Sequence, residues 1–240
     1  MKRHGAFHEK NWRTTITFVQ MKKKIIILGG GLSGIYLGYR LKKAGFAVKI
    51  LEASDSIGGR ISTQNVKNTK IELGAAWLWK YNSELLKVCN ELDLTLFPQH
   101  MKGDALFEPA KKQTPERFQV PKNQEISYRM AGGTATILEK LSKGFTRNEL
   151  QLHQKVVQIA ATDTSIKVMT AKSEFTSDVV VSTIPPQLLV NSVTFIPTVQ
   201  PHLIQVANNT HTWMKDAIKF AVVYKKPFWR EKGLSGAGFS

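Results

Sequence analysis

The sequence lacks several features, and each absence excludes a class of protein. Cys89 is the only cysteine among 240 residues. A disulfide within the chain is therefore impossible, which favours a reducing, cytoplasmic location. No stretch of 18 or more apolar residues exists, so we expect no transmembrane segment. The six histidines show no spacing that suits a metal site, and we predict none.

Acidic residues are also scarce. The chain has 18 Asp plus Glu against 34 Lys plus Arg, a formal net charge of +16. A basic protein can bind nucleic acid or an anionic membrane surface. The charge is spread along the chain without a zinc-finger or RNP-type motif, so we interpret it as a solvated basic surface. Nucleic-acid binding is kept only as an alternative, which salt-sensitive DNA binding would support.

The hydrophobic content of 42% suits one globular domain or two small ones. Near the N-terminus the only apolar run is Thr15–Val19, which is too short for a signal peptide. Met21 precedes a lysine run and is an alternative start. We interpret residues 1–22 as a disordered extension, and we expect Cys89, within the helical pattern of residues 83–93, to be a packed core thiol.

The first part of the chain predicts a strand, a helix and a second strand. Lys24–Leu28 is a continuous apolar run, typical of a buried parallel strand. A helix follows from Ile35 through Ala44, and Gly45 is placed to end it. Ala47–Glu52 is the second strand. This order predicts a right-handed βαβ unit and an α/β fold.

Between the first strand and its helix lies the spacing G-x-G-x-x-G, formed by Gly29, Gly31 and Gly34. The first glycine permits a tight turn, the second lets backbone approach a pyrophosphate, and the third lets helix and strand pack closely. Ser33 adds a hydroxyl donor. Glu52 closes the second strand, where a carboxylate accepts hydrogen bonds from ribose hydroxyls. The pattern predicts a dinucleotide site.

A second glycine pair favours FAD over NAD. Gly58 and Gly59 let another backbone segment approach the cofactor, and Arg60 supplies a fixed fork of donors that offsets phosphate charge. Coupled to Glu52 at this spacing, the pair resembles the glutathione-reductase-like FAD-binding fold.

The rest of the chain predicts further elements with less regularity. We expect a helix over Thr134–Leu141, a hairpin of Lys155–Ile159 and Ser165–Thr170, a buried strand over Asp178–Ser182 stopped by Pro185 and Pro186, a last strand over Ala217–Tyr224, and loops or short helices over residues 102–127.

From Ile25 onward the sequence resembles the flavin-containing amine oxidases, which include monoamine, polyamine and L-amino-acid oxidases and histone demethylases of that type. The motifs that carry the resemblance are Ile71–Trp77, similar to E-L-G-A-x-W, then Met130–Gly133, Lys155–Ile159, Val179–Pro186 and Ile218–Trp229. The resemblance implies an FAD-binding Rossmann-like domain over residues 23–78 and 131–197. It implies part of an α+β substrate domain over 79–130 and 198–240.

The resemblance also extends the set of candidate cofactor residues to the segment that approaches the flavin and to a valine that contacts adenine. The full set is Gly29, Gly31, Leu32, Ser33, Gly34, Glu52, Ala53, Gly58, Gly59, Arg60, Gly74, Ala75, Ala76, Trp77 and Val156.

Lys219 is the candidate catalytic residue, because it matches the lysine that holds a water against flavin N5 in the family. In a strand of period two, Lys219 shares a face with Ala217, Ala221 and Val223, so it is a lone charge among small apolar neighbours. A solvent-facing lysine on an edge strand is the alternative. Pro227 and the aromatic pair after it, at the family's offset, favour the functional role.

The implied reaction is hydride transfer from the carbon bearing an amine to flavin N5, giving an imine, with O2 reoxidising the flavin to yield H2O2. The chain ends soon after Lys219, whereas family members continue for a comparable length. We therefore expect a truncated or split enzyme, with a second chain as one source of the missing C-terminal half. A non-catalytic FAD-binding fragment and a carotenoid desaturase or protoporphyrinogen oxidase-like flavoprotein are the alternatives. The sequence does not name the amine.

Overall fold

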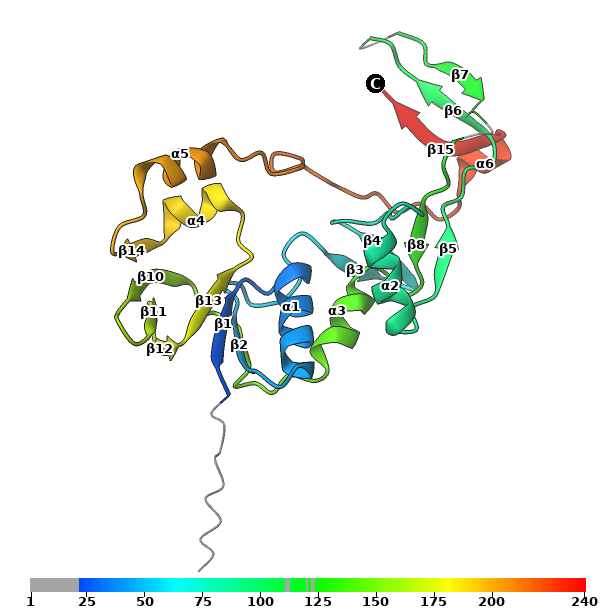
Figure 1. Ribbon diagram of the computed structural model, residues 1–240. Coiled ribbons are helices and arrows are strands. Elements are labelled where there is room, and N and C mark those ends of the chain that lie inside the picture. The colour runs from blue at the N-terminus through cyan, green and yellow to red at the C-terminus, as the bar shows by residue number, and fades with distance from the viewer. Residues whose placement is uncertain (1–21, 111–112, 120, 122–123) are drawn as a thin grey trace, which may run out of the picture.

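The computed structural model describes residues 22–110, 113–119, 121 and 124–240. The predicted N-terminal extension, apart from Lys22, lies outside the described residues. A four-stranded parallel sheet occupies the middle of the molecule (Figure 1). Its strand order is β13–β1–β2–β9, formed by Val179–Ser182, Lys24–Leu28, Ala47–Leu51 and Leu150–Gln151.

Both faces of β1 are buried, which explains its continuous apolar sequence. Ile25 and Ile27 belong to one core cluster with residues of helices α1 (Leu32–Lys43) and α3 (Ala135–Ser142). Ile26 and Leu28, on the other face, pack with residues of a second sheet. The predicted βαβ unit and the helix at α3 are confirmed. The strand predicted over Asp178–Ser182 is present as β13, but it lies at the edge of the sheet and is only partly buried.

The second sheet has the strand order β12–β11–β10–β14 (Glu174–Ser177, Ile166–Thr170, Val156–Ala161 and Thr194–Ile196). Strands β10 and β11 form the predicted antiparallel hairpin. The break predicted at Pro185 and Pro186 is where helix α4 (Pro186–Ser192) begins, with proline in its first turn. Helix α5 (Pro201–Asn209) packs against α4.

On the other side of α1 lie two small two-stranded sheets and a helix (Figure 1). Strands β3 (Thr63–Val66) and β4 (Thr69–Glu72) pair with each other, as do β5 (Leu96–Pro98) and β8 (Tyr128–Met130). The predicted helix at residues 83–93 is α2 (Ser83–Glu91). Cys89 on α2 is fully buried, as expected of a core thiol, and this burial raises the pKa of Cys89. No helix within the described residues has the length and apolarity to cross a membrane.

The prediction of loops or short helices over residues 102–127 was wrong. This region contains strands β6 (Asp104–Phe107) and β7 (Glu116–Gln119), which form a sheet of order β15–β6–β7. Strand β15 (Leu234–Phe239) comes from the far end of the chain and follows the short helix α6 (Phe228–Glu231). Strand β6 pairs with a strand some 130 residues away in the chain. The local sequence, which is rich in Lys, Pro and Gln, does not indicate that pairing.

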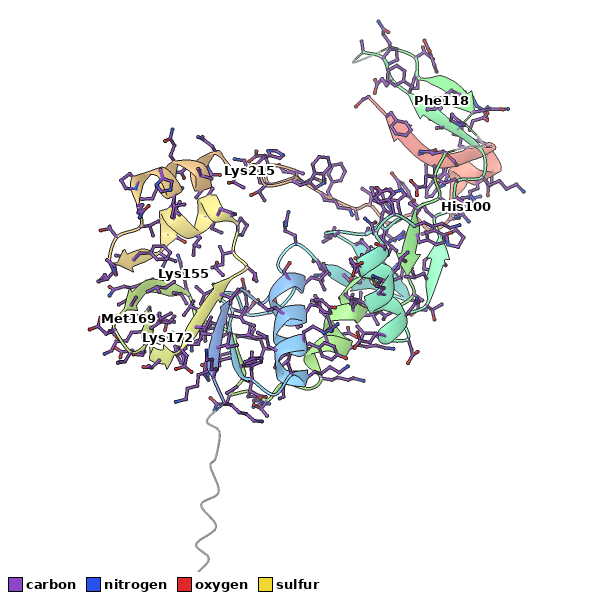
Figure 2. The ribbon with its side chains drawn as sticks, in the orientation of Figure 1. His100, Phe118, Lys155, Met169, Lys172 and Lys215 are labelled. Carbon is purple, nitrogen blue, oxygen red and sulfur yellow. The ribbon has the colours of Figure 1, made fainter. Side chains whose placement is uncertain are left out.

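The last predicted strand, Ala217–Tyr224, was also wrong. The chain between α5 and α6 runs as an extended ribbon that crosses from one side of the molecule to the other (Figure 1), without helix or strand. Lys215 projects from this connection, while Lys155 and Lys172 lie at the second sheet, which contains β10, β11 and β12 (Figure 2). A strand needs a hydrogen-bonded neighbour, and among the described residues this segment has none.

Candidate dinucleotide-binding site

The turn from β1 into α1 brings the predicted glycines together. Gly29 has a φ of +103°, a conformation that side chains other than glycine's rarely adopt. A Cβ on Gly34 would overlap the carbonyl oxygen of Gly29. The first turn of α1 therefore packs directly on the backbone of the loop, which only glycine permits.

The N-terminus of α1 is open. Gly31 is the N-cap, no side chain within the described residues caps the helix, and its first turn has no acidic residue. Leu32 is partly buried against the core, while Ser33 is exposed beside the loop. Unpaired N–H groups and the positive end of the helix dipole are the elements of an anion site.

Glu52 turns toward this loop. Its Oε2 accepts a hydrogen bond from the Gly30 N–H at 2.6 Å, and its Oε1 accepts one from the Ser54 N–H at 2.8 Å. Ala53, between Glu52 and Ser54 in the sequence, is exposed. Gly30 was not among the predicted residues. The signal that identifies it is its place between the first two glycines of the motif, opposite the carboxylate.

The second glycine pair packs on the first glycine loop. The Gly58 N–H donates to the Gly30 carbonyl at 2.9 Å, and Gly31 and Gly58 form an isolated parallel bridge. A Cβ on Gly59 would lie 3.4 Å from the Cα of Gly31. The two loops therefore meet backbone to backbone.

The segment Gly74–Trp77 is joined to the same assembly. The Ala75 N–H donates to the Arg60 carbonyl at 2.9 Å, and a Cβ on Gly74 would overlap that carbonyl oxygen. Ala76 is buried, whereas Trp77 is 57% exposed. Three segments that are separate in the sequence thus form one continuous backbone layer.

Val156, the candidate adenine contact, starts β10 and is buried. The Gln154 N–H donates to the Glu52 carbonyl at 2.7 Å, so the start of β10 is held beside the end of β2. Val156 packs with Leu28 and Leu51 on the face of the sheet opposite α1. It therefore lies near Glu52.

Lys219 reaches the same layer although the strand predicted for it is absent. Its Nζ donates to the Gly74 carbonyl at 2.8 Å and lies 5.5 Å from the Trp77 ring centroid. The residue is exposed as a whole, but its ammonium group is partly desolvated against these neighbours. This desolvation lowers the pKa of Lys219, with nearby Glu72 opposing the shift and Arg129 adding to it.

Arg60 does not point freely into the site. Its Nη1 donates to the carbonyl of Trp213 at 2.9 Å. Arg60 and Lys219 together hold the connection between α5 and α6 over the predicted cofactor segments. The expectation that the Arg60 side chain faces phosphate stays a prediction.

Glu72 is a buried carboxylate that the predicted set omitted. It accepts hydrogen bonds from the Thr63 hydroxyl at 2.9 Å and from the Thr134 N–H at 2.7 Å, at the N-terminus of α3. A Cβ on Gly133 would overlap the Thr63 side chain. Glu72 therefore ties the β3–β4 hairpin to α3. The signal was a lone acid inside the apolar run Ile71–Trp77.

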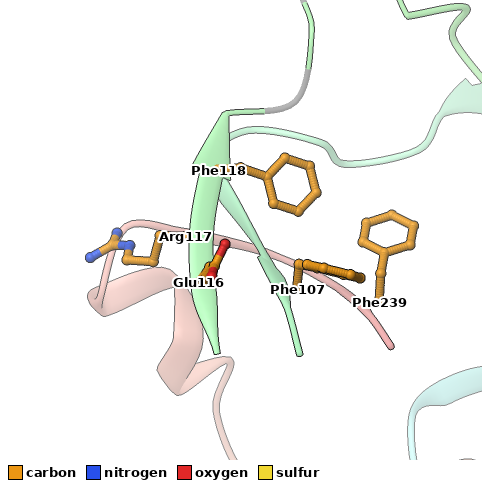
Figure 3. Close-up of a pocket in the computed structure, with 5 residues that line it drawn as sticks. All are labelled: Phe107, Glu116, Arg117, Phe118 and Phe239. Carbon is orange, nitrogen blue, oxygen red and sulfur yellow. The ribbon is translucent and has the colours of Figure 1, made fainter. Parts of the chain in front are cut away.

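A hollow of about 490 Å³ lies elsewhere, on the β15–β6–β7 sheet. Figure 3 shows its lining, which consists of Phe107, Glu116, Arg117, Phe118 and Phe239. None of the predicted site residues lines it. The candidate site therefore rests on backbone geometry around the glycines and not on the shape of a cavity.

Comparisons with known proteins agree with this geometry. The family model described as flavin containing amine oxidoreductase matches residues 32–126 and 110–240. A probable flavin-containing monoamine oxidase A from Dictyostelium discoideum is 32% identical over 119 residues, covering 50% of this chain and 25% of that protein. A putrescine oxidase from Kocuria rosea is 28% identical over 95 residues, covering 40% of this chain and 20% of that protein.

A solved structure of wild-type putrescine oxidase bound to putrescine superposes with a TM-score of 0.76 at 17% identity. It covers 91% of this chain and 70% of that one. This likeness shows a shared fold. The regions matched in the two curated relatives amount to a quarter of their length or less.

The chain belongs to the family of flavin-containing amine oxidoreductases. This confirms the resemblance, the fold class and FAD as the family's cofactor. The residues present fit the ADP part of FAD, because a side chain at Gly29 or Gly34 would overlap its neighbours, the α1 N-terminus is uncapped, and Glu52 faces the loop.

Proposed function

We propose that this chain binds FAD and forms part of an enzyme that oxidises a small-molecule amine to an imine. When bound, FAD accepts a hydride at N5 from the carbon bearing the amine and passes the electrons to O2, giving H2O2. The observation that carries the proposal is the Glu52 carboxylate, hydrogen-bonded to Gly30 at the open N-terminus of α1.

In this proposal each segment has a distinct task. The N–H groups of the Gly29–Gly34 loop and of the first turn of α1 hold the diphosphate. Glu52 accepts hydrogen bonds from the ribose hydroxyls, and Val156 lies at the adenine end. The Gly58–Arg60 loop lies along the cofactor between the Gly29–Gly34 loop and Gly74–Trp77, which is at the flavin end. Residues 23–78 and 131–197 form the FAD-binding domain, and residues 79–130 and 198–240 belong to the substrate domain.

Lys219 is proposed to hold a water near the reacting centre. Its position against Gly74 and Trp77 supports this role, because those residues belong to the segment assigned to the flavin end. Its lowered pKa means that it loses its proton more easily than an ordinary lysine. If Lys219 has this role, Lys219→Met changes flavin reduction or reoxidation in stopped-flow measurements. Unchanged rates for both steps would reject the assignment.

FAD binding tests the central part of the proposal. Titration of the purified chain with FAD, followed by flavin fluorescence, gives its Kd. We expect Glu52→Gln to raise the Kd about 10- to 100-fold, because each tenfold loss corresponds to about 1.4 kcal/mol of lost hydrogen bonding. The matched control is Glu174→Gln, which removes an exposed carboxylate paired with Lys167 and leaves the Kd unchanged. Equal affinities for all three proteins contradict the assignment.

Amine oxidation needs a separate measurement. Peroxide formation with putrescine and with a simple monoamine as probes, in the presence of saturating FAD, tests the reaction. A flavin spectrum without amine-dependent peroxide supports the alternative of an FAD-binding module without catalysis.

A further inference from the structure

Arg129 lies at the centre of a row of three side chains on neighbouring strands. On one side, β8 pairs with β5 so that Arg129 is opposite Phe97. On the other side, Leu78 and Tyr128 form an antiparallel bridge, in which each N–H donates to the carbonyl of the other, at 3.0 Å and 2.7 Å. The next pair in this register is Trp77 and Arg129. The row therefore runs Phe97–Arg129–Trp77, and side chains of one row share a face of the sheet.

The face that carries this row is the open one. The neighbouring residues Leu78 and Met130 point to the opposite face and are buried in the core cluster that contains residues of α1 and α3. Phe97 is 44% exposed and Trp77 57%, and Arg129 between them is partly buried. A cation that is partly removed from water attracts an anion more strongly than a fully solvated one does.

Arg129 has no acidic partner within the described part of the chain, because none of the ion pairs found there involves it. Lys219 lies beside the same row, 5.5 Å from the ring centroid of Trp77. Besides desolvation, the charge of Arg129 lowers the pKa of Lys219, whereas Glu72 raises it. Glu72 is buried, and both of its carboxylate oxygens already accept hydrogen bonds from protein groups. The open face therefore holds two neighbouring cations, which together favour an anionic ligand.

We infer that Arg129 binds a carboxylate of the substrate, so that the amine that is oxidised is an α-amino acid. This inference rests on the proposed function, because Trp77 belongs to the segment assigned to the flavin end. An arginine matches a carboxylate with two parallel N–H donors. Lys219, proposed to hold a water near the reacting centre, borders the same Trp77 ring. A carboxylate on Arg129 would therefore lie close to the reacting carbon, and in an α-amino acid it is attached to that carbon.

The same charges disfavour a diamine. Putrescine carries a second ammonium group, which Lys219 and Arg129 repel. The aromatic side chains of the row favour an apolar or aromatic substituent. We therefore expect phenylalanine to bind better than its decarboxylated counterpart, 2-phenylethylamine, and both to bind better than putrescine.

Calorimetric titration of the full chain, loaded with FAD, tests the inference. L-Phenylalanine and 2-phenylethylamine are the probes, because they differ only in the carboxylate. We expect the Kd of phenylalanine to be lower by about tenfold or more, since the amine lacks the group that accepts the charge-assisted hydrogen bonds of the arginine. Putrescine should have the highest Kd of the three.

Two substitutions of Arg129 separate its charge from its shape. Arg129→Gln removes the charge and should make the Kd values of phenylalanine and 2-phenylethylamine equal. Arg129→Lys keeps the charge but not the fork of donors, so a weaker preference for phenylalanine should remain. Arg147→Gln is the matched control, because Arg147 is exposed between α3 and β9, and it leaves both Kd values unchanged. Far-UV circular dichroism checks that each variant is folded.

Three outcomes overturn the inference: equal Kd values for the two probes in the unaltered chain, binding of neither probe, or a preference for phenylalanine that survives Arg129→Gln. Each of them leaves the FAD assignment standing as long as the chain takes up FAD. Failure to bind FAD contradicts the proposed function and the inference with it, and the flavin fluorescence titration shows this before either probe is added.

Discussion

Two regions of the molecule differ in how tightly they are packed. One is the glycine layer, formed by Gly29–Gly34, Gly58, Gly59 and Gly74, and the other is the 217–224 segment, the connection from Ala217 to Tyr224. In the glycine layer backbone lies against backbone, and a single Cβ would overlap a neighbour at Gly34 or Gly74. In the 217–224 segment large side chains such as Phe220 meet solvent. The first region is held by backbone contacts between segments that are separate in the sequence, whereas within the described part of the chain residues 218–225 of the second make no backbone–backbone hydrogen bond. Changes in the two regions should therefore differ greatly in effect.

The largest effect is expected inside the glycine layer. Gly34→Val adds atoms where the Gly29 carbonyl already lies, so α1 cannot dock on its loop. We expect a loss of about 3 kcal/mol or more in the free energy of unfolding, measured by urea denaturation. Gly144→Ala is the matched control, because nothing lies near its added Cβ, and its loss should stay within about 0.5 kcal/mol. A tolerated Gly34→Val would show that the layer is looser than its geometry implies.

A moderate effect is expected at the buried carboxylate that supports the layer. Glu72→Ala leaves the Thr63 hydroxyl and the Thr134 N–H without their acceptor. We expect a loss of about 2 kcal/mol in the free energy of unfolding, because buried donors pay their desolvation cost when unpaired. Glu84→Ala removes only an exposed ion pair with Lys87 and serves as the control. Equal losses for the two variants would contradict the role of Glu72.

The smallest effect is expected where the two regions touch. Trp77→Ala removes the ring beside Lys219, so the lowered pKa of Lys219 should move back toward its ordinary value of 10.5. The measurement is the acetylation rate of Lys219 against pH, by peptide mass spectrometry. In the variant the midpoint of this curve moves to higher pH. Removing the ring also changes the access of the reagent to Lys219, which alters the height of the curve and not its midpoint. Tyr81→Ala, an exposed aromatic stacked on Trp79, is the control and leaves the midpoint unchanged.

The sign of the accompanying stability change follows from linkage. Because the pKa of Lys219 is lowered in the folded state, the unfolded chain binds this proton more tightly. Stability therefore rises with pH between the folded pKa of Lys219 and 10.5, and this rise is smaller in Trp77→Ala. An unchanged pH dependence would show that Trp77 does not desolvate the lysine.

The sequence predicted well where structure is local. Strand β1 has the predicted bounds, and the bounds of α1 and β2 are close to the predicted ones. These elements are predictable because their turn, helical period and apolar runs depend on residues that are adjacent in the sequence. The prediction failed at β6, whose partner β15 is distant in the sequence. It also failed at Ala217–Tyr224, which has the composition of a strand but no paired strand within the described residues. Composition encodes the capacity to form a strand, but pairing is a property of the whole fold.

The sequence by itself determined the βαβ unit, the glycine spacing and the acid at Glu52, because a tight turn and a close backbone approach require particular residues at particular offsets. Only the tertiary structure decided that Gly58, Gly74 and Lys219 join that loop, and that Glu72 is the buried tie between β4 and α3. These contacts link residues that are far apart along the chain, and their positions are fixed by packing of the two core clusters and not by any local preference.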